Sequence, residues 1–562
     1  SFPTRRSSDL IVWNSVPYTV ESETMTRELF ETCLLLSKRL DKKYNKQTIA
    51  AKMTDVPGHT RSIIDPMYDA GIRLLHVGIN SACPLPSVPT FCRWRSPSGN
   101  DLLLVYQKDY GEDEVLPDGK TVVSINFTGD NHGPHSYERV KKIYADLRKR
   151  YPQAQLVGAS FNDVARELLL IKKDLPVVTS EIGDTWIFGY GGAPIRMAKF
   201  RAVSRLYSQW LNEGKIKKDS DVALDFAAEL GLIAEHTQGV DVKTHLRQWD
   251  KYDMDKFLKG RSEGIFSMAE ASWKEIDNYI DSAIAFLPAS LQKEAREVVA
   301  EVDKVKLEDN SKMKPMERKR WEQPIAGGMT LAGLSYQMFD GDDYDDFQNR
   351  YLRARYGWAL DDLGKRGLKE SHAVSVTLYA QTMAQSVRKE KKGTRIITEL
   401  RFPENEKVDK RVYPERIQVN CFTTKNGKRS EVALTIYGKP AVRLPESYWL
   451  SFTVPGIESV IAEKMGERVD LMDVVEKGNR QMHGIDRYVD LITSGETIRI
   501  SSKEAFLLNV GEAQGLNYST NYPDKRKGAH FNLNNNLWGT NFSMWNEGSL
   551  TYHFVIETLN RK

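Results

Sequence analysis

The sequence predicts a multidomain protein in which an incomplete α/β barrel, a helical bundle and a C-terminal antiparallel β-sandwich follow one another. Three observations support this fold class. Strand and helix patterns alternate through residues 11–192, apolar residues recur at helical spacing across 193–393, and β-branched, aromatic and turn residues dominate 394–562. A chain of 562 residues is long enough for several hydrophobic cores.

The composition of the chain argues against nucleic acid and membranes as binding partners. The chain is 40% apolar and 28% charged, and its net charge of +4 is too small to indicate binding to nucleic acid or to an anionic membrane. No apolar run approaches the roughly 18 residues of a membrane span. The four cysteines show no C-x-x-C spacing and no disulfide framework. The sequence leaves open whether the protein is cytoplasmic, periplasmic or secreted, and whether it forms a homo-oligomer.

Residues 1–10 differ from the rest of the chain. The segment SFPTRRSSDL lacks an initiator Met and does not share the pattern of the residues after it. It resembles a translated sequencing adapter, so we exclude it from fold reasoning. We expect native sequence to begin near Ile11, inside a domain, which implies a chain truncated at its N-terminus and a signal region lying upstream.

The first region alternates strands with helices. Strands are predicted at 11–18, 50–55, 73–79, 102–106, 155–159 and 177–179, and helices at 24–43, 61–71, 136–151 and 162–171. This alternation is typical of a parallel sheet with crossover helices, and we favour an incomplete barrel over an open sheet.

The two later regions differ in the spacing of their apolar residues, which is helical in the first and typical of strands in the second. Helical spacing predicts helices at 198–213, 222–235, 254–286 and 291–307, and over much of 351–385. Beyond residue 394, short strands with turn signals between them predict a sandwich, with the clearest examples at 411–422, 430–438, 447–454, 496–502 and 550–557.

Asp55 and His59 are the first candidates for chemistry. Asp55 ends the predicted strand 50–55, and His59 follows a Pro-Gly turn. In a parallel α/β barrel, residues at the carboxyl ends of strands line the active site. The alternative is that Asp55 caps the next helix and His59 is a structural histidine.

Three further segments carry polar side chains that could take part in catalysis or binding. The loop 128–134 contains Asp130 and Asn131, but it also fits a plain turn with an N-cap. Glu181 and Asp184 directly follow a strand and precede Trp186, whose ring could raise a carboxyl pKa, although helix capping explains them equally. His236 ends a helical run, where a single histidine is usually structural.

Taken in this order, the segments resemble glycoside hydrolase family 38, the zinc-dependent α-mannosidase superfamily, and most closely an uncharacterised branch of it. The resemblance rests on TDVPGHT (54–60) with DAGIRLLHVGI (69–79), PVVTSEIGDTWIFG (176–189) and LIAEHTQGVDVKTH (232–245). In the C-terminal half it rests on GKPAVRLPESYWLSF (438–452) and FNLNNNLWGTNFSMWN (531–546). It spans nearly the whole chain from Ile11.

The resemblance implies a hydrolase of carbohydrate metabolism, a zinc-dependent retaining exo-glycosidase acting on α-mannosides or related glycosides. Asp55 would be the nucleophile and a zinc ligand, His236 a second ligand, and Asp184 the general acid/base, with Glu181 as the alternative. The sugar would contact Asp130, Asn131, Trp186 and Tyr190. Retaining glycosidases use two carboxyl groups about 5–5.5 Å apart, and a zinc with an open position can hold sugar hydroxyls. His59 would bond the turn.

Two departures qualify this resemblance. The family has a further metal-binding His and Asp, two residues apart, near the start of the barrel, yet residues 11–50 contain no His. We expect these two ligands to lie upstream, so that this chain holds half a zinc site and its own activity is in question. Thr237 also replaces the Asp that follows the ligand histidine in the family, which bears on mannose specificity.

Two other functions fit some of the same residues. In a metal-dependent polysaccharide deacetylase, Asp55 and His59 would both bind the metal, but a further ligand is needed and His76 lies in an apolar strand. A carbohydrate-binding or scaffold protein without turnover would use Trp538 and Trp545 of the sandwich. The neighbour of Asp55 discriminates between the two enzyme classes, since the glycosidase requires His236 there and the deacetylase requires His59.

Overall fold

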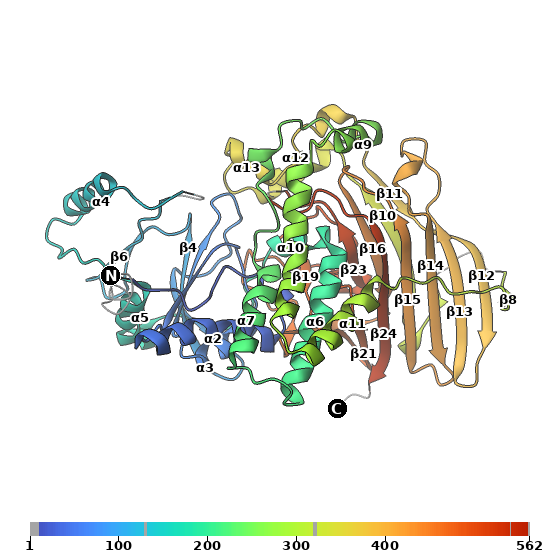
Figure 1. Cartoon of the computed structure of the whole chain (residues 1–562), viewed down its shortest axis with the longest axis horizontal. Coiled ribbons are helices and arrows are strands. Elements are labelled where there is room, and N and C mark those ends of the chain that lie inside the picture. Colours follow the sequence, from blue (N-terminus) through green and yellow to red (C-terminus); the bar gives the residue numbers. More distant parts are fainter. Residues whose placement is uncertain (1–10, 129–131, 318–322, 540, 560–562) are drawn as a thin grey trace.

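The computed structural model describes residues 11–128, 132–317, 323–539 and 541–559. Figure 1 shows three parts side by side: the N-terminal α/β region, a central group of helices and a large β region. Strands and helices of the three parts share a continuous hydrophobic core. The predicted order of α/β, helical and β regions is therefore confirmed.

The N-terminal sheet has five strands in the order β1-β2-β4-β3-β7. Neighbours β1, β2 and β4 run parallel, whereas β3 is antiparallel to β4 because a short loop joins the two directly. Every residue of β2 is buried, as expected of a strand covered on both faces. The sheet does not close into a barrel. The strands are β1 (Ala50–Asp55), β2 (Leu74–Ile79), β3 (Phe91–Arg95), β4 (Asp101–Lys108) and β7 (Val177–Val178), with a separate hairpin of β5 (Asp113–Val115) and β6 (Val122–Ser124).

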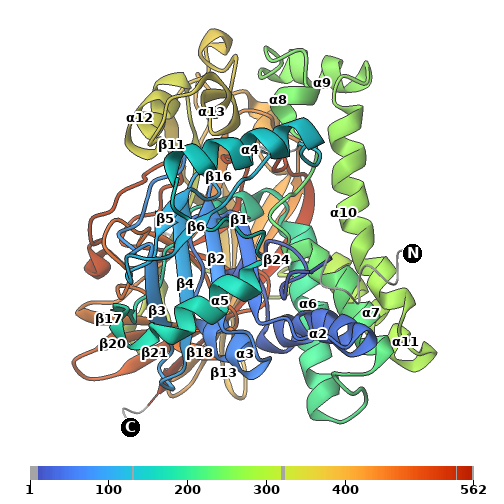
Figure 2. The ribbon, with the colours of Figure 1, turned by 90° about the vertical axis from the view of Figure 1, so that its left-hand side faces the viewer.

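Helices cover both faces of this sheet. Helix α5 (Phe161–Leu170) crosses the strands in Figure 2, and its Ala165 and Leu168 pack on β1, β2 and β4. Helix α2 (Arg27–Tyr44) begins at its N-cap Thr26 and packs against the central helices. The short helix α3 (Ile64–Asp69) contacts β4, and the longer α4 (Tyr137–Arg150) follows the β5–β6 hairpin in the chain.

Two predicted strands are wrong. Residues 11–18 form no strand and instead run beside β1, where the Ser15 amide donates to the Ala50 carbonyl at 3.2 Å. Residues 155–159 are irregular, and Val157 is 69% exposed, so this apolar segment finds no sheet to join. Local alternation alone did not reveal that no partner strand was available to them.

The central helices agree with the predicted bundle, except that residues 254–286 form two helices, α9 and α10, in place of the single predicted one. Helix α10 packs on α7, and α11 packs on α6. Each buries an apolar stripe, as helical spacing requires. Their bounds are α6 (Pro194–Asn212), α7 (Asp221–Leu230), α8 (Val242–His245), α9 (Met254–Ser262), α10 (Ser267–Ala285) and α11 (Ala289–Asp303).

The β region starts well before residue 394. Strand β10 (Thr330–Met338) pairs with both β11 (Val376–Tyr379) and β16 (Glu446–Thr453). The helix predicted over 351–385 is therefore wrong from Val376 onward, where a β-branched and aromatic run adds to the sheet edge. The helices in and just before this stretch are α12 (Gly341–Tyr351), α13 (Gly357–Asp362) and the 3₁₀ helix η7 (Lys369–Ser371).

Two antiparallel sheets form the predicted sandwich. One follows the order β11-β10-β16-β23-β22-β19, with β9 on β10, and the other follows β18-β17-β20-β21-β24-β15-β14-β13-β12-β8. They meet face to face, since Phe452 and Phe531 of one sheet lie 5.4 and 5.0 Å from Phe554 of the other, measured between ring centroids. The remaining strands are β8 (Lys314–Pro315), β9 (Gln323–Pro324), β12 (Gln381–Lys389), β13 (Gly393–Arg401), β14 (Arg416–Thr424), β15 (Arg429–Lys439), β17 (Ile457–Lys464), β18 (Glu467–Asp470), β19 (Met482–Gly484), β20 (Tyr488–Thr493), β21 (Thr497–Ser502), β22 (Leu507–Val510), β23 (Ala529–Asn535) and β24 (Gly548–Leu559).

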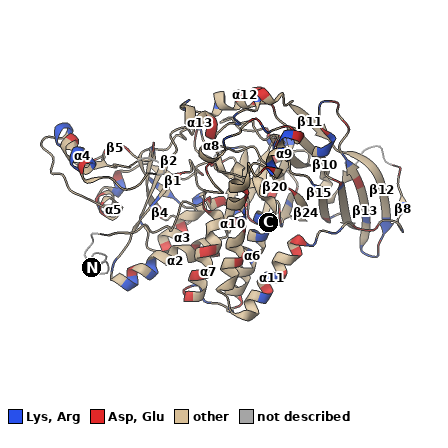
Figure 3. Ribbon diagram, turned by 45° about the horizontal axis from the view of Figure 1, so that its top comes forward, with Lys and Arg blue, Asp and Glu red and all other residues tan. Residues whose placement is uncertain are grey.

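Charge is mixed over the ribbon. In Figure 3, basic and acidic residues alternate along exposed helices such as α4, α2 and α11. Among the described residues, no helix combines the length and apolar character that a bilayer crossing requires.

Candidate active site

Asp55 occupies a strained position at the carboxyl end of β1. Its φ is 74°, in the left-handed region that residues other than glycine rarely adopt. Such backbone outliers concentrate at functional sites, where the surrounding structure holds them in place. Its side chain is 13% exposed, so it is not fully sealed from solvent.

The ends of the two neighbouring strands hold the Asp55 carboxylate. Asn80, just beyond β2, donates from Nδ2 to Asp55 Oδ1 at 3.1 Å. Tyr110, beyond β4, donates a short hydrogen bond from its hydroxyl to the same oxygen. The Asn80 amide also donates to the Asp55 carbonyl at 2.9 Å. Residues at three adjacent strand ends therefore hold Asp55 Oδ1 in place, and Oδ2 takes no part in these hydrogen bonds.

Tyr110 reaches Asp55 because β2 has a glycine beside it. A Cβ atom on Gly78 would lie 2.7–2.8 Å from backbone atoms of Tyr110, closer than real Cβ contacts allow. Tyr110 itself has a φ of 66°, so its turn is as strained as the Asp55 position. The close backbone approach at Gly78 is thus a condition for the contact between Tyr110 and Asp55.

His236 faces the second oxygen of Asp55. Its Nε2 lies 3.0 Å from Asp55 Oδ2, and its Nδ1 lies 2.5 Å from Glu235 Oε1. The His236 backbone amide donates to the Thr19 carbonyl at 3.1 Å, which ties this segment to the N-terminal region. The residue follows the 3₁₀ helix η5 (Gly231–Ala234). The predicted pairing of Asp55 with His236 is therefore present in the fold.

The electrostatics of this pair favour its charged form. Burial lowers the pKa of His236, but the hydrogen bond to Asp55 and the Glu235 carboxylate outweigh burial and raise it to about 10. Burial raises the pKa of Asp55, whereas His236, Tyr110 and Asn80 together lower it below its usual value. At neutral pH the two side chains form an imidazolium–carboxylate pair in this structure.

His59 does not lie in this cluster. Neither of its ring nitrogens has a hydrogen-bond partner among the described residues, so the prediction that its side chain bonds the turn is wrong. Its backbone pairs with Ile182 instead, and a Cβ on Gly58 would lie 2.2 Å from the Ile182 carbonyl. Burial, followed by the His236 charge, lowers the pKa of His59 to about 3. The arrangement that a deacetylase would require is absent from the described residues.

Aromatic rings extend from His236 toward the sandwich. The Trp186 ring lies 5.8 Å from that of His236 and 6.5 Å from that of Trp538. Trp186 is only 2% exposed, and its indole N–H points toward Cys83 Sγ at 3.1 Å. Tyr190 is buried, and its hydroxyl donates to the Glu235 carbonyl at 2.7 Å. In this structure Tyr190 positions the His236 segment.

Asp184 and Glu181 have different surroundings from Asp55. Asp184 is 3% exposed and accepts hydrogen bonds from the amides of Trp186 and Ile187 at 2.8 and 3.2 Å, at the start of the 3₁₀ helix η4 (Trp186–Gly192). Burial raises the pKa of Asp184. Burial and the Asp184 charge raise the pKa of the neighbouring Glu21 carboxyl well above its usual value. One proton shared by the two carboxyls accounts for their coexistence.

Glu181 is fully engaged in structural contacts. Its Oε1 accepts hydrogen bonds from the Arg61 amide at 2.8 Å and from the Thr60 hydroxyl at 3.1 Å. Its Oε2 lies 3.3 Å from Lys464 Nζ, and both partners are about 2% exposed or less. These contacts join the loop after β1 to β17 of the sandwich.

The remaining predicted residues divide into buried and undescribed ones. Asp130 and Asn131 lie outside the described residues. The ring of Phe127, a little before them in the chain, lies 5.3 Å from that of Tyr110, measured between ring centroids, in a tilted arrangement. Trp538 and Trp545 are 3% and 4% exposed, so neither ring offers a sugar-binding platform on the surface.

The donors present fall short of a zinc site. A catalytic zinc takes three protein ligands and an open position. Asp55 and His236 supply two, and no set of three or more His, Cys, Asp or Glu side chains within the described ranges is arranged to hold a metal. These residues alone do not fit a zinc ion, so we derive no chemical step through one.

Sequence reasoning missed Tyr110 and Asn80. A signal was available for Asn80, which directly follows the predicted strand 73–79, whereas Tyr110 lies in the turn beyond the predicted strand 102–106. Carboxyl ends of parallel strands meet at one edge of the sheet, so polar residues there belong together. The sequence does not predict that the hydroxyl of Tyr110 turns back over the edge of the sheet to reach Asp55.

Comparison with known proteins defines the fold. A protein-family model described as a domain of unknown function, DUF5054, matches residues 191–323. The crystal structure of an alpha-mannosidase from Enterococcus faecalis V583 is similar over 100% of this chain and 79% of that one, with a TM-score of 0.58 and 10% sequence identity. A glycosyl hydrolase family 38 protein from Enterococcus faecalis covers 97% of this chain and 77% of its own, with a TM-score of 0.47 and 10% identity. No protein of curated function matches the sequence. The chain therefore has a fold like that of the Enterococcus faecalis V583 alpha-mannosidase.

Proposed function

We propose that this chain is a retaining glycoside hydrolase in which Asp55 is the nucleophile, with α-mannosides as the first substrate class to test. The fold is that of a glycoside hydrolase. The observation that supports the proposal best is the Asp55 carboxylate itself: partly exposed, strained, and fixed through one oxygen at the carboxyl edge of the sheet.

The properties of Asp55 suit nucleophilic attack on an anomeric carbon. A retaining mechanism requires an ionised carboxylate to attack and a second carboxyl group to protonate the leaving oxygen. The lowered pKa keeps Asp55 ionised. Tyr110 and Asn80 restrain rotation about its side chain, so that less freedom is lost on reaching the reactive geometry. His236 limits where Oδ2 can point.

Asp184 is our proposed acid/base, with Glu181 as the second choice. Burial raises the pKa of Asp184, and the neighbouring Glu21, whose pKa is raised well above its usual value, is the group from which Asp184 would receive the proton that a general acid needs. Its buried position and its hydrogen bonds to the amides of η4 suit a capping residue as well. Substrates with different leaving groups separate these two roles, because only a general acid responds to the basicity of the leaving oxygen.

Covalent trapping tests the nucleophile directly. The chain would be incubated with aryl glycosides of several sugars, α-mannosides included, and then with the matching activated fluoro-sugar inactivator. We expect turnover of at least one substrate and a stoichiometric mass increase on the peptide that contains Asp55. Asp55→Asn should abolish both, whereas Asp118→Asn, in an exposed turn, should change neither. Labelling at another carboxylate, or no turnover of any glycoside, would refute the proposal.

A further inference from the structure

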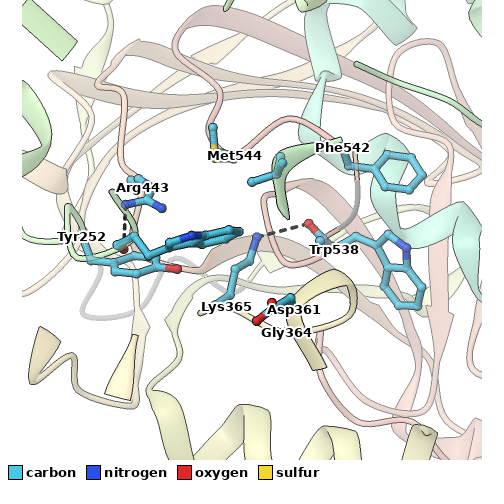
Figure 4. Close-up of a pocket in the computed structure, with 11 residues that line it drawn as sticks. Tyr252, Asp361, Gly364, Lys365, Arg443, Trp538, Phe542 and Met544 are labelled. Atoms are coloured by element: carbon cyan, nitrogen blue, oxygen red, sulfur yellow. Dashed lines mark hydrogen bonds between the residues drawn. The ribbon is translucent and has the colours of Figure 1, made fainter. Parts of the chain in front are cut away.

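A second polar site lies apart from Asp55, in a small cavity between the helical region and the sandwich. Its volume is about 20 Å³, and its lining includes Trp249, Tyr252, Lys365, Arg443, Trp538 and Met544. Figure 4 shows Arg443 and Lys365 extending into this cavity from different segments of the chain. The cavity is notable because it combines two cationic side chains with walls that are largely apolar.

Arg443 is a buried cation that makes no ion pair among the described residues, although the Asp250 charge acts on it from a distance. It is 3% exposed, and its one described hydrogen bond runs from Nη1 to the Trp249 carbonyl at 3.2 Å. Its guanidinium also stacks over Tyr252 at 4.2 Å and over Phe266 at 5.2 Å. No ion pair involves Arg443 in the described part of the chain. Burying an uncompensated charge is costly, so a further compensating group is expected.

Lys365, which lines the same cavity, also lacks an ion pair within the described ranges. Its ammonium donates to the Trp538 carbonyl at 3.1 Å and has no carboxylate partner among the described residues. Burial and then the nearby Arg443 charge lower the pKa of Lys365 to about 7. Asp361 also lines the cavity, but its carboxylate pairs with Arg366 at 3.4 Å. Two cations therefore face one cavity without a matching protein anion.

We propose that this cavity is a binding site for one chloride-sized inorganic anion, held between the Lys365 ammonium and the Arg443 guanidinium. The size decides the class of ligand. A cavity needs roughly 10–15 Å³ of this kind to hold one water molecule, so about 20 Å³ admits a monatomic anion and excludes a sugar ring or a phosphate.

The proposed anion would stabilise the region behind the active site. Lys365 holds the backbone of Trp538, and the Trp538 ring packs on Trp186, which in turn neighbours His236. Neutralising the repulsion between Lys365 and Arg443 should therefore stabilise the junction of three segments. This proposal does not depend on glycoside hydrolysis and can be tested without an assay.

Thermal unfolding in matched salts is the first test. At constant ionic strength, replacing sodium gluconate by sodium chloride or bromide should raise the melting temperature of the wild type to a saturating value. Lys365→Met should lose this shift, whereas Lys369→Met, which removes the same charge from an exposed side chain nearby, should keep it. A wild type that responds equally to gluconate and to halide would overturn the proposal.

Bromide diffraction gives a test that does not depend on variant folding. A crystal soaked in bromide should show an anomalous peak within hydrogen-bond distance of Arg443 and Lys365. Arg443→Met, if it folds, should lack both the peak and the halide-dependent shift. Bromide peaks only at surface positions would count as adventitious ions and would refute the assignment.

Discussion

Asp55 Oδ2 and His236 Nε2 lie 3.0 Å apart, although the two residues are 181 positions apart in the chain. The contact joins the carboxyl edge of the N-terminal sheet to the end of a central helical run. His236 is thus the histidine that contacts Asp55, whereas the ring nitrogens of His59 have no hydrogen-bond partner among the described residues.

Tyr110→Phe should reduce the activity that depends on Asp55. The hydroxyl donates to a carboxylate that must point in one direction, and hydrogen bonds to charged groups are worth about 1.5–3 kcal/mol. We expect kcat/KM to fall by about 10- to 100-fold on a good substrate, with an unchanged circular dichroism spectrum. Tyr137→Phe, at a 74% exposed position, is the matched control. Equal activity of the two variants would remove Tyr110 from the site.

Gly78→Ala should destabilise the sheet edge. The added methyl group would lie 2.7–2.8 Å from the Tyr110 backbone, so β2 or the Tyr110 turn must shift. Overpacking of this kind costs about 1–3 kcal/mol, measurable as a lower urea midpoint. Gly357→Ala, where no atom lies within 4 Å of the new Cβ, is the control and should leave the midpoint unchanged or slightly higher.

Asp184→Asn distinguishes an acid from a cap. If Asp184 protonates the leaving oxygen, kcat should fall steeply for poor leaving groups and little for activated aryl glycosides. If it only caps η4, the rate should change equally for all leaving groups and the melting temperature should drop. Rates across a leaving-group series, measured beside thermal unfolding, separate the two outcomes.

Acid should destabilise the fold through His76. Burial, then the Lys52 charge, lowers its pKa in the folded state to about 3. The unfolded chain takes up this proton near pH 6.5, so the folded state loses stability as the pH falls from about 6.5 toward 3. This group alone should cost about 2–3 kcal/mol between pH 6.5 and 4.5. Urea titrations of His76→Gln should show a smaller loss over that interval, and the exposed control His245→Gln should match the wild type.

Zinc should bind weakly to a site built from the described residues alone. Asp55 and His236 provide two donors, one fewer than catalytic zinc sites use. We expect purified protein to retain well below one zinc per chain after dialysis, as measured by elemental analysis. One tightly held equivalent that disappears in His236→Ala would show that ligands outside the described residues complete the site.

Local patterns were enough for much of the fold. Helical spacing located the central helices, and alternation with turn residues located five strands of the sandwich, β14, β15, β16, β21 and β24, because both periods are properties of neighbouring residues. The failures lie where a partner decides the outcome. Val376 begins a strand because β10 offers an edge, and residues 155–159 stay irregular because no strand lies beside them.

The candidate site divides in the same way. Local pattern was enough to place Asp55 at the end of a strand, and the ordered motifs indicated the fold and the pairing of Asp55 with His236. Packing in three dimensions was needed to bring Tyr110 and Asn80 onto this carboxylate, to engage Glu181 and Asp184 with backbone amides, and to turn Lys365 and Arg443 toward one cavity. The position of a strand end depends on the hydrophobic pattern of neighbouring residues, so the sequence alone predicts it. The direction of a hydroxyl group, or the approach of two cations that are distant in the chain, depends on how separate elements pack against one another.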